Sequence, residues 1–294
     1  MKFGIRYCNT GPFFAPERAV HLAQKAEAVG AESLWTVEHV VVPRAYESKY
    51  PYSADGKMGA LEEAPIPDPL IWLAWAAGVT TRIKLATGIL ILPQRHPFYT
   101  AKQLATLDVL SGGRAILGVG IGWLEEEFRG LGIPWDARAE RTEECIAALR
   151  SLWSDVPSAF AGKHYAWGAA ESNPKPVQKP AVPIVIGGQV AATARRAARL
   201  GDGFFPARTD NLPELMEALR RECAAIGRDP RAVEVTTGIV GRLPTRDDVE
   251  QLAALGVSRV LIALPDASRD GVERALDRVG NELIGRGRSA TTST

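Results

Sequence analysis

At residues 114–123 the sequence RAILGVGIGW passes from an apolar run into closely spaced glycines and then into a helix start. A short apolar run bounded by turn residues is typical of a strand buried on both faces of a parallel sheet. The same succession of strand, turn and amphipathic helix repeats in both directions along the chain. Strands are predicted at residues 2–7, 33–37, 83–92, 114–119, 184–186, 203–206, 233–239 and 259–263. Eight such units predict an α/β protein folded as a (β/α)8 barrel, or TIM barrel.

Two segments interrupt this rhythm within a single predicted domain of residues 1–284. Residues 38–67 form a loop rich in Pro, Tyr, Ser and Gly, and loops of that length are usually lids or disordered. Residues 154–183 carry five prolines and are predicted to be an insertion after helix four, with a hairpin at 160–167. The small, polar tail at 285–294 is predicted to be disordered. A doubly wound sheet is the alternative fold, but nothing divides the chain into two halves.

The charge and composition exclude several classes of protein. The net charge is +1, from 35 basic and 34 acidic residues, so we expect no nucleic-acid or membrane partner. The three cysteines are widely spaced and form neither a CxxC metal site nor a disulfide framework. The N-terminus runs directly into a strand without a signal-peptide segment, and no apolar run reaches about 18 residues. We therefore expect a cytoplasmic protein that holds no metal and acts on a small molecule.

Catalytic groups of a barrel come from the C-terminal ends of its strands and the loops that follow them. Of the four histidines, only His39 stands directly at such a position. An imidazole there can donate to a cofactor ring or move a proton near neutral pH. A purely structural histidine is the alternative. Glu38 either orients His39 or faces the barrel interior, and the sequence leaves both open.

Glycines follow several of the predicted strands. Gly88 interrupts the third strand before Ile89, which suggests a bulge or the close approach of a ligand, with plain strand packing as the alternative. Gly120 and Gly122 allow backbone to approach a ligand, and their spacing does not fit a dinucleotide fingerprint. Trp123 either covers a ring or staples the next helix. Residues 125–127, three glutamates, are expected to be a solvated helix start.

A second glycine-rich turn, Gly187-Gly188-Gln189, runs into a helix and predicts an anion site. Ala207-Arg208 brings a guanidinium to the same rim, where it can pair with phosphate or carboxylate. The chain has no GxSxG elbow, no HExxH motif and no paired carboxylates at these positions. Phosphate-type loops, one histidine and no nucleophile or metal indicate cofactor chemistry.

Several motifs in order along the chain resemble one known family. They are Ser33–His39 with Pro43, Ala86–Pro97, Leu104–Asp108 with Ser111–Arg114, Gly118–Trp123, Pro174–Gln178, Ile186–Gly188 and Ala198–Gly203. Together they resemble the luciferase-like monooxygenase superfamily, in its F420-dependent oxidoreductase branch. The resemblance covers about residues 1–285.

The resemblance implies a bacterial-luciferase-like barrel with an insertion after helix four, often a homodimer, that binds a flavin or deazaflavin at the C-terminal rim. It implies a non-prolyl cis peptide at Gly88–Ile89 and a histidine, His39, near the reactive edge of the ring. The positions that match cofactor contacts are Glu38, Gly88, Ile89, Gly120, Gly122, Trp123, Glu126, Ile186, Gly187, Gly188, Gln189, Ala207 and Arg208. Many F420-dependent relatives have Asp where this chain has Glu38.

The leading hypothesis is hydride transfer between coenzyme F420 and an unidentified small organic substrate, with His39 and Glu38 as catalytic residues. The first alternative is an FMN-dependent flavin monooxygenase. The second, from a different class, is a cofactor-binding barrel without turnover.

Overall fold

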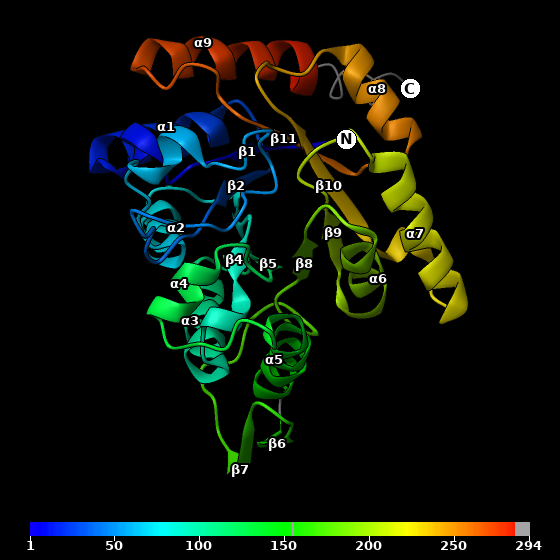
Figure 1. The fold of residues 1–294 in the computed structure, drawn as a ribbon. Helices are drawn as coiled ribbons and strands as arrows, with labels where there is room; N and C mark the ends of the chain where they lie inside the picture. The colour runs from blue at the N-terminus through cyan, green and yellow to red at the C-terminus, as the bar shows by residue number, and fades with distance from the viewer. Residues whose placement is uncertain (155, 286–294) are drawn as a thin grey trace, which may run out of the picture.

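A closed parallel barrel forms the centre of the computed structural model, which describes residues 1–154 and 156–285 (Figure 1). The strands are β1 (Lys2–Arg6), β2 (Ser33–Thr36), β3 (Lys84–Thr87), β4 (Leu90–Ile91), β5 (Ala115–Gly120), β8 (Ile184–Gly187), β9 (Gly203–Phe205), β10 (Glu234–Ile239) and β11 (Arg259–Ile262). β3 and β4 are two halves of the third strand, and both pair with β5, which closes the ring. The predicted eight-stranded (β/α)8 barrel is confirmed.

Helices follow the strands and surround the barrel, with α1, α2 and α3 on one side in Figure 1 and α6, α7 and α8 on the other. They are α1 (Pro16–Ala28), α2 (Pro69–Gly78), α3 (Pro97–Leu110), α4 (Glu125–Gly130), α5 (Arg138–Trp153), α6 (Ala191–Leu200), α7 (Leu212–Ala225), α8 (Arg246–Ala254) and α9 (Arg269–Val279). Asp68 begins α2 by accepting the backbone N–H groups of Leu70 and Ile71. Thr245 and Asp248 begin α8 with a reciprocal capping box.

The two segments that interrupt the rhythm lie outside the ring of strands. In the insertion, β6 (Ser158–Ala161) and β7 (Ala166–Ala170) pair antiparallel, as the predicted hairpin requires, and project away from the barrel (Figure 1). The loop at 38–67 contains one short 3-10 helix, Gly59–Glu62, and crosses the C-terminal side of the barrel. We call this loop the roof loop. Of the predicted tail, residues 286–294 lie outside the described residues.

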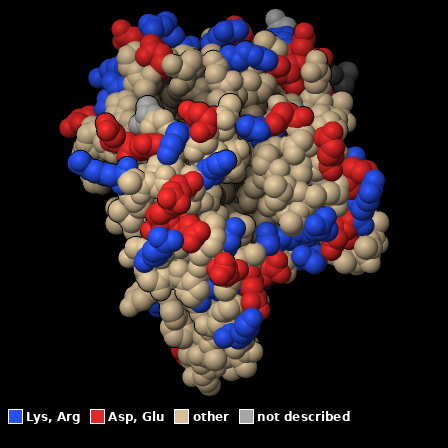
Figure 2. Space-filling view, viewed as in Figure 1, with Lys and Arg blue, Asp and Glu red and all other residues tan. Residues whose placement is uncertain are grey.

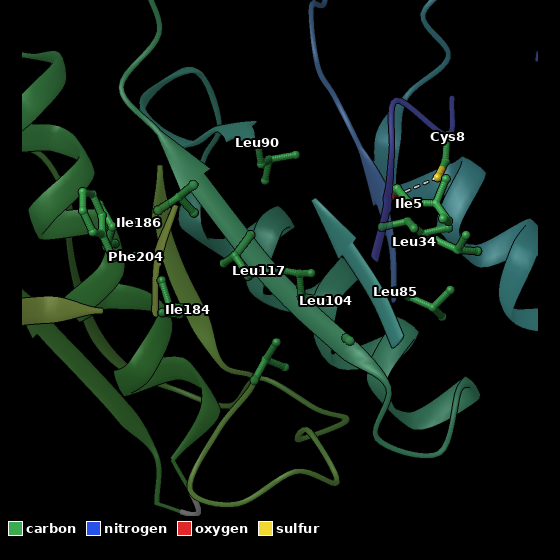
Figure 3. Packing of buried hydrophobic residues seen from close by; sticks show 14 of the residues in the cluster. Ile5, Cys8, Leu34, Leu85, Leu90, Leu104, Leu117, Ile184, Ile186 and Phe204 are labelled. Carbon is green, nitrogen blue, oxygen red and sulfur yellow. Dashed lines mark hydrogen bonds between the residues drawn. The ribbon is translucent and has the colours of Figure 1, made fainter. Parts of the chain in front are cut away.

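The larger core lies between the strands and the helices. Alternate strand residues point outward, and Ile5, Leu34, Leu85, Leu117 and Ile184 meet helix side chains such as Leu104 of α3 (Figure 3). Full burial of each such side chain stabilises the fold by about 1.5–3 kcal/mol. The three cysteines are free and buried, as the small apolar groups of this core.

The largest side chain in the barrel interior is that of Trp35. Its ring packs against Phe205, with 5.5 Å between ring centroids, and its Nε1 donates to Ser33 Oγ at 2.7 Å. A Cβ at Gly4 would lie 2.9 Å from Trp35 Nε1, and one at Gly88 would lie 2.8 Å from Trp35 Cε3. Inward positions therefore need glycine so that the indole can fit between them.

The N-terminal end of the barrel is closed by ion pairs. Arg259 is almost completely buried, and its Nε lies 2.8 Å from Glu32 Oε2, while its Nη1 pairs with Glu234. Burial tends to raise the pKa of Glu32, but the hydrogen bond and charge of Arg259 outweigh it and lower the pKa. This end of the barrel is thus packed and charge-balanced, and a ligand has to enter from the other end.

Gly118→Ala tests the close packing inside the barrel. A Cβ there would overlap the carbonyl oxygen of Thr87, which belongs to the backbone and cannot rotate away. We expect the free energy of unfolding to fall by at least about 2 kcal/mol, measured by urea denaturation. The control is Gly168→Ala in β7, where nothing lies within 4 Å of the added Cβ and the change should stay within about 0.5 kcal/mol. Equal stability of the two variants would contradict this account of the interior.

Candidate active site

The C-terminal ends of the strands surround a partly open mouth. Most predicted site residues are half-exposed there, including His39, Ile89, Trp123 and Gln189. The face drawn in Figure 2 is hollowed near its centre, and side chains of both charge signs are interspersed on it. A mouth of this kind, above a filled interior, is where barrel enzymes hold their ligands.

The third strand is interrupted by a cis peptide between Gly88 and Ile89, as the resemblance implied. The Ile89 side chain then lies over the centre of the barrel. A Cβ at Gly120 would lie 2.8 Å from Ile89 Cδ1, and one at Gly187 would lie 2.5 Å from Ile89 Cγ2. These two glycines are therefore required by Ile89, so the predicted close approach of a ligand is not what makes them necessary.

The other two rim glycines serve turns. Gly122 has φ +79°, and a Cβ there would lie 2.6 Å from Phe128 of α4. Gly188 has φ +147°, and a Cβ there would lie 2.7 Å from Thr193 Oγ1. Both turns lead a strand directly into a helix that needs a positive φ at this point.

His39 is held by a buried carboxylate from α4. Its Nδ1 lies 3.0 Å from Oε2 of Glu127, whose side chain has no exposed surface. Oε1 of Glu127 accepts the backbone N–H groups of Val40, at 2.6 Å, and Val41, at 3.2 Å. Burial tends to raise the pKa of Glu127, but the hydrogen bonds from His39 and Val41 outweigh it and lower the pKa. The expectation that residues 125–127 are all solvated is wrong for Glu127.

The contact with Glu127 also determines which ring nitrogen of His39 can meet a ligand. With Nδ1 engaged by the carboxylate, the second nitrogen, Nε2, makes no hydrogen bond to any residue in 1–154 or 156–285. A partner on Nδ1 fixes the tautomer and the ring orientation. The arrangement can present Nε2 to a proton donor or acceptor in the mouth.

The Glu38 carboxylate makes no hydrogen bond to the His39 ring within the described part of the chain. Its carboxylate accepts the backbone N–H of Ile91 at 2.5 Å and the Nε of Arg95 at 2.9 Å. Arg95 also reaches Asp68, the residue that caps α2, at 3.0 Å. Burial raises the pKa of Glu38 against the opposing charge of Arg95. Its catalytic role stays a prediction that this geometry does not favour, because the carboxylate joins β2, β4 and α2.

Trp123 connects the rim with the roof loop. Its ring contacts His39, Tyr46 and Tyr50 edge-on, with centroids 5.7, 5.6 and 5.1 Å away. Glu126 anchors the same loop, because its Oε1 accepts the backbone N–H groups of Glu47, at 2.7 Å, and Ser48, at 3.2 Å. Although burial opposes it, these bonds lower the pKa of Glu126 to about 2. Glu126 thus shapes the mouth by holding its cover.

The predicted anion site lies at the C-terminal ends of β8 and β9. Gln189 bridges β8 and β9, since its Oε1 accepts the Arg208 N–H at 3.0 Å and its Nε2 donates to the Arg208 carbonyl at 3.1 Å. The following helix, α6, has Val190 as its N-cap residue, with no side-chain cap and no acidic residue in its first turn. Its free N–H groups can bind an anion. Arg208 and half-exposed Ala207 lie beside it, and the Arg208 guanidinium pairs with Asp210 at 2.7 Å.

Ile186 does not enter the mouth. Its side chain is buried in the core on the helix side of β8 (Figure 3), so only its backbone can touch a ligand.

The sequence predicts that the loop with Tyr46, Tyr50 and Tyr52 roofs the pocket, but it did not point to three residues at the mouth. Arg6 and Phe205 end β1 and β9, Tyr7 directly follows β1, and Tyr50 of the roof loop lies near Arg6 and Tyr7. Tyr7 is the one non-glycine residue of the described chain with a positive φ, 62°, a conformation that clusters at functional sites. The alternation of inward and outward residues along β1 was the available signal, since it places Arg6 on the face of Gly4.

Residues 1–154 and 156–285 lack two features that would change the class of protein. No helix there is long and apolar enough to cross a membrane. No cluster of three or more His, Cys, Asp or Glu side chains there has the geometry of a metal site.

Residues 3–289 match the model of the luciferase-like monooxygenase family. The chain is 31% identical over 287 residues to "Uncharacterized protein Rv0953c" of Mycobacterium tuberculosis, covering 96% of this chain and 99% of that one. It is 31% identical to an F420-dependent glucose-6-phosphate dehydrogenase of Kineococcus radiotolerans, covering 80% and 66% of the two chains. It is 33% identical to an FMNH2-dependent dimethylsulfone monooxygenase of Pseudomonas putida, covering 64% and 52%. The chain therefore belongs to the luciferase-like monooxygenase family, whose members include F420-dependent and FMN-dependent oxidoreductases.

Solved structures agree on the fold. The monooxygenase RslO1 of Streptomyces bottropensis superimposes with a TM-score of 0.79 at 22% identity, covering 98% of this chain and 100% of that one. The coenzyme F420-dependent tetrahydromethanopterin reductase of Methanopyrus kandleri superimposes with a TM-score of 0.74 at 20% identity, covering 97% and 99%.

Glu127→Ala tests the anchor of His39. The variant removes the buried carboxylate that binds the Val40 and Val41 N–H groups and His39 Nδ1, and hydrogen bonds to a charged group contribute about 1.5–3 kcal/mol each. We expect the free energy of unfolding at pH 7 to fall by about 3 kcal/mol or more. Because the pKa of Glu127 is lowered in the folded protein, its contribution is present above the unfolded pKa and declines as the pH falls through the folded one.

The matched control is Glu125→Ala, two residues earlier in the same helix. The Glu125 side chain is 42% exposed, and among the described residues it forms an ion pair with Arg129, one turn later, so its loss should cost less than about 0.5 kcal/mol. A Glu127→Ala protein as stable as this control would show that the buried contact is not an anchor.

Proposed function

We propose that this protein transfers hydride between coenzyme F420 and a small organic substrate. The observation that carries the proposal is His39, held at Nδ1 by the buried carboxylate of Glu127 with Nε2 left for a ligand. A positioned imidazole contributes about 10²–10⁴-fold to a reaction that moves a proton. The C-terminal rim of a barrel is where such a group meets its substrate.

The residues at the mouth fit a flavin-type cofactor. Ile89 offers a half-exposed aliphatic surface at the rim, where Trp123 and His39 are in contact, and the uncapped start of α6 with Arg208 offers a phosphate site. When bound, a reduced deazaflavin supplies hydride. His39 would hold or move a proton at Nε2, while Trp123 and the roof loop exclude water from the mouth.

The relatives support both cofactors, and we favour F420 on the extent of the similarity. The F420-dependent relative matches over 242 residues and the FMN-dependent one over 193, at nearly equal identity. The second candidate is therefore an FMN-dependent monooxygenase. A barrel that binds a cofactor without turnover is the third.

Titration of the purified protein with F420 and with FMN tests the proposal, with cofactor fluorescence as the readout. We expect saturable binding of F420 and much weaker binding of FMN. Tight binding of FMN without affinity for F420 would replace the proposal with the monooxygenase.

His39→Ala tests the catalytic assignment in the same protein. We expect F420 binding to persist and the oxidation of reduced F420 by a panel of unsaturated carbonyl compounds to slow by about 10²–10⁴-fold. The control is His21→Ala, because His21 lies on α1 and pairs with Glu273 at 3.2 Å. An unchanged rate in His39→Ala would leave cofactor binding without a catalytic histidine.

We also propose that the protein is a homodimer through α2 and α3. Every residue of α2 is uncharged, and yet Ile71 and Trp75 are 73% and 53% exposed. Tyr99 and Leu110 of α3 are exposed as well. A helix that is apolar on all sides is normally buried. A second copy of the chain offers an identical apolar face, so the two can cover each other across a twofold axis.

Trp75→Glu places a charge in the centre of this face. We expect light scattering after gel filtration to show a dimer for the unchanged protein and a monomer for the variant. Ile226→Glu, at the end of α7 and 48% exposed, is the control and should leave the dimer intact. A monomeric unchanged protein would contradict the proposal.

A further inference from the structure

We infer that Arg6 binds a carboxylate group of the substrate inside the mouth of the barrel. The inference rests on the proposed function, because it names the class of substrate that the same site would take. It is carried by a buried guanidinium that pairs with no carboxylate in the part of the chain that the structure describes.

Arg6 is the last residue of β1, and its side chain extends across the interior of the barrel. It is 8% exposed, and its Nη1 lies 3.3 Å from the carbonyl oxygen of Ala207 beyond β9. The position that a Cβ of Gly238 would occupy is 3.0 Å from the same Nη1. The guanidinium therefore spans from β1 to β9 and β10.

The guanidinium lies close to the predicted cofactor site. Its carbon is 5.8 Å from the centre of the Phe205 ring. The same ring lies 3.3 Å from the position of a Cβ at Gly88. Arg6 and the bulge in the third strand thus both lie against the Phe205 ring.

The other three arginine residues that are buried in the described chain have carboxylate partners or several acceptors. Arg259 pairs with Glu32 and Glu234, and Arg196 pairs with Glu143. Arg114 forms no ion pair with a described residue, but it donates five hydrogen bonds to neighbouring oxygens. Each of these three side chains has a structural explanation.

Arg6 differs because its partners are few and neutral. It donates to the Ala207 carbonyl and, at 2.7 Å, to the Tyr7 hydroxyl, and no carboxylate in residues 1–154 or 156–285 pairs with it. Two of its five N–H donors are therefore used. Burial of an uncompensated charge is costly, so a charge kept in this position fits the binding of an anion.

Hydroxyl groups and aromatic walls surround the guanidinium. Burial raises the pKa of Tyr50, with a further rise from Tyr7 and Tyr52, and Arg6 opposes it. The Tyr50 ring packs on Tyr52 and Trp123, with centroids 5.4 and 5.1 Å away. The Tyr50 phenol therefore stays protonated at neutral pH and can donate to an anion beside Arg6.

A single negative charge fits this environment best. The next cation along the mouth, Arg208, pairs with Asp210 at 2.7 Å and belongs to the proposed phosphate site of the cofactor, so one guanidinium is left for the substrate. A planar carboxylate matches the fork of a guanidinium in two parallel hydrogen bonds. A dianionic phosphate monoester would need a second cation. The anions of the cofactor itself are the competing ligand, and the experiment separates them.

The test compares ligands of equal shape and different charge. Cinnamate with cinnamamide, and benzoate with benzamide, are titrated calorimetrically into the full-length protein with and without bound cofactor. We expect each carboxylate to bind at least about tenfold more tightly than its amide, which is the scale of one charge-assisted hydrogen bond. Equal affinities, or no carboxylate binding, would overturn the inference.

Arg6→Gln should abolish the preference for the carboxylate and leave the affinity for F420 within about twofold. Arg208→Gln should weaken the binding of F420 and leave the preference for the carboxylate unchanged, because Arg208 lies at the proposed phosphate site. Arg6→Lys keeps the charge and loses the fork, so it should retain part of the preference. The Arg6→Lys variant replaces Arg6→Gln as the test if the Arg6→Gln protein melts at a much lower temperature than the unchanged protein. Weaker F420 binding in Arg6→Gln with an unchanged carboxylate preference would assign Arg6 to the cofactor.

The two proposals fail in different ways. A protein that binds neither F420 nor FMN contradicts the proposed function, while the carboxylate preference is still measured on the cofactor-free protein. A protein that binds F420 without distinguishing carboxylate from amide contradicts only the role of Arg6.

Discussion

The structure depends on the fit of one indole ring inside the barrel. Trp35 fills the interior, and Gly4 and Gly88 leave space for it at the facing positions. Strand pairing alone would close a barrel of this size around an empty centre, and close packing is what makes such a barrel a core. Because Trp35 and Phe205 fill the centre, ligands are confined to the mouth above them.

The two ends of this filled barrel treat buried charge differently. At the N-terminal end, Arg259 is neutralised by Glu32 and Glu234, and the charges serve the fold. At the C-terminal end, Arg6 donates to a carbonyl and a hydroxyl and pairs with no carboxylate among the described residues, while the carboxylate of Glu127 binds His39 and backbone. A protein can tolerate an unbalanced buried charge where a ligand supplies the balance. The same asymmetry separates stability from function in barrels generally.

The sequence predicted what is local and failed where contacts are distant. Eight strand–helix units are visible because each strand and helix shows its own hydrophobic period. The meaning of the glycines is not local, since Gly120 and Gly187 are separated by 67 positions and both make room for Ile89. Residues 125–127 look alike in sequence, and α4, at six residues, is too short to show which of them is inward. His39, the partner that distinguishes Glu127, lies 88 positions earlier.

The buried carboxylate of Glu127 also helps to fix the long roof loop in place over the mouth of the barrel. Glu127 holds the start of the roof loop at Val40 and Val41, and Glu126 holds it again at Glu47 and Ser48. Both carboxylates come from the first turn of α4, which directly follows β5. One short helix, α4, therefore sets the positions of both His39 and the roof loop. A displacement of the roof loop is expected to displace His39 as well. A rigid helix start is better suited to this than the loop itself, because fixing each loop residue costs about 1–2 kcal/mol of conformational entropy.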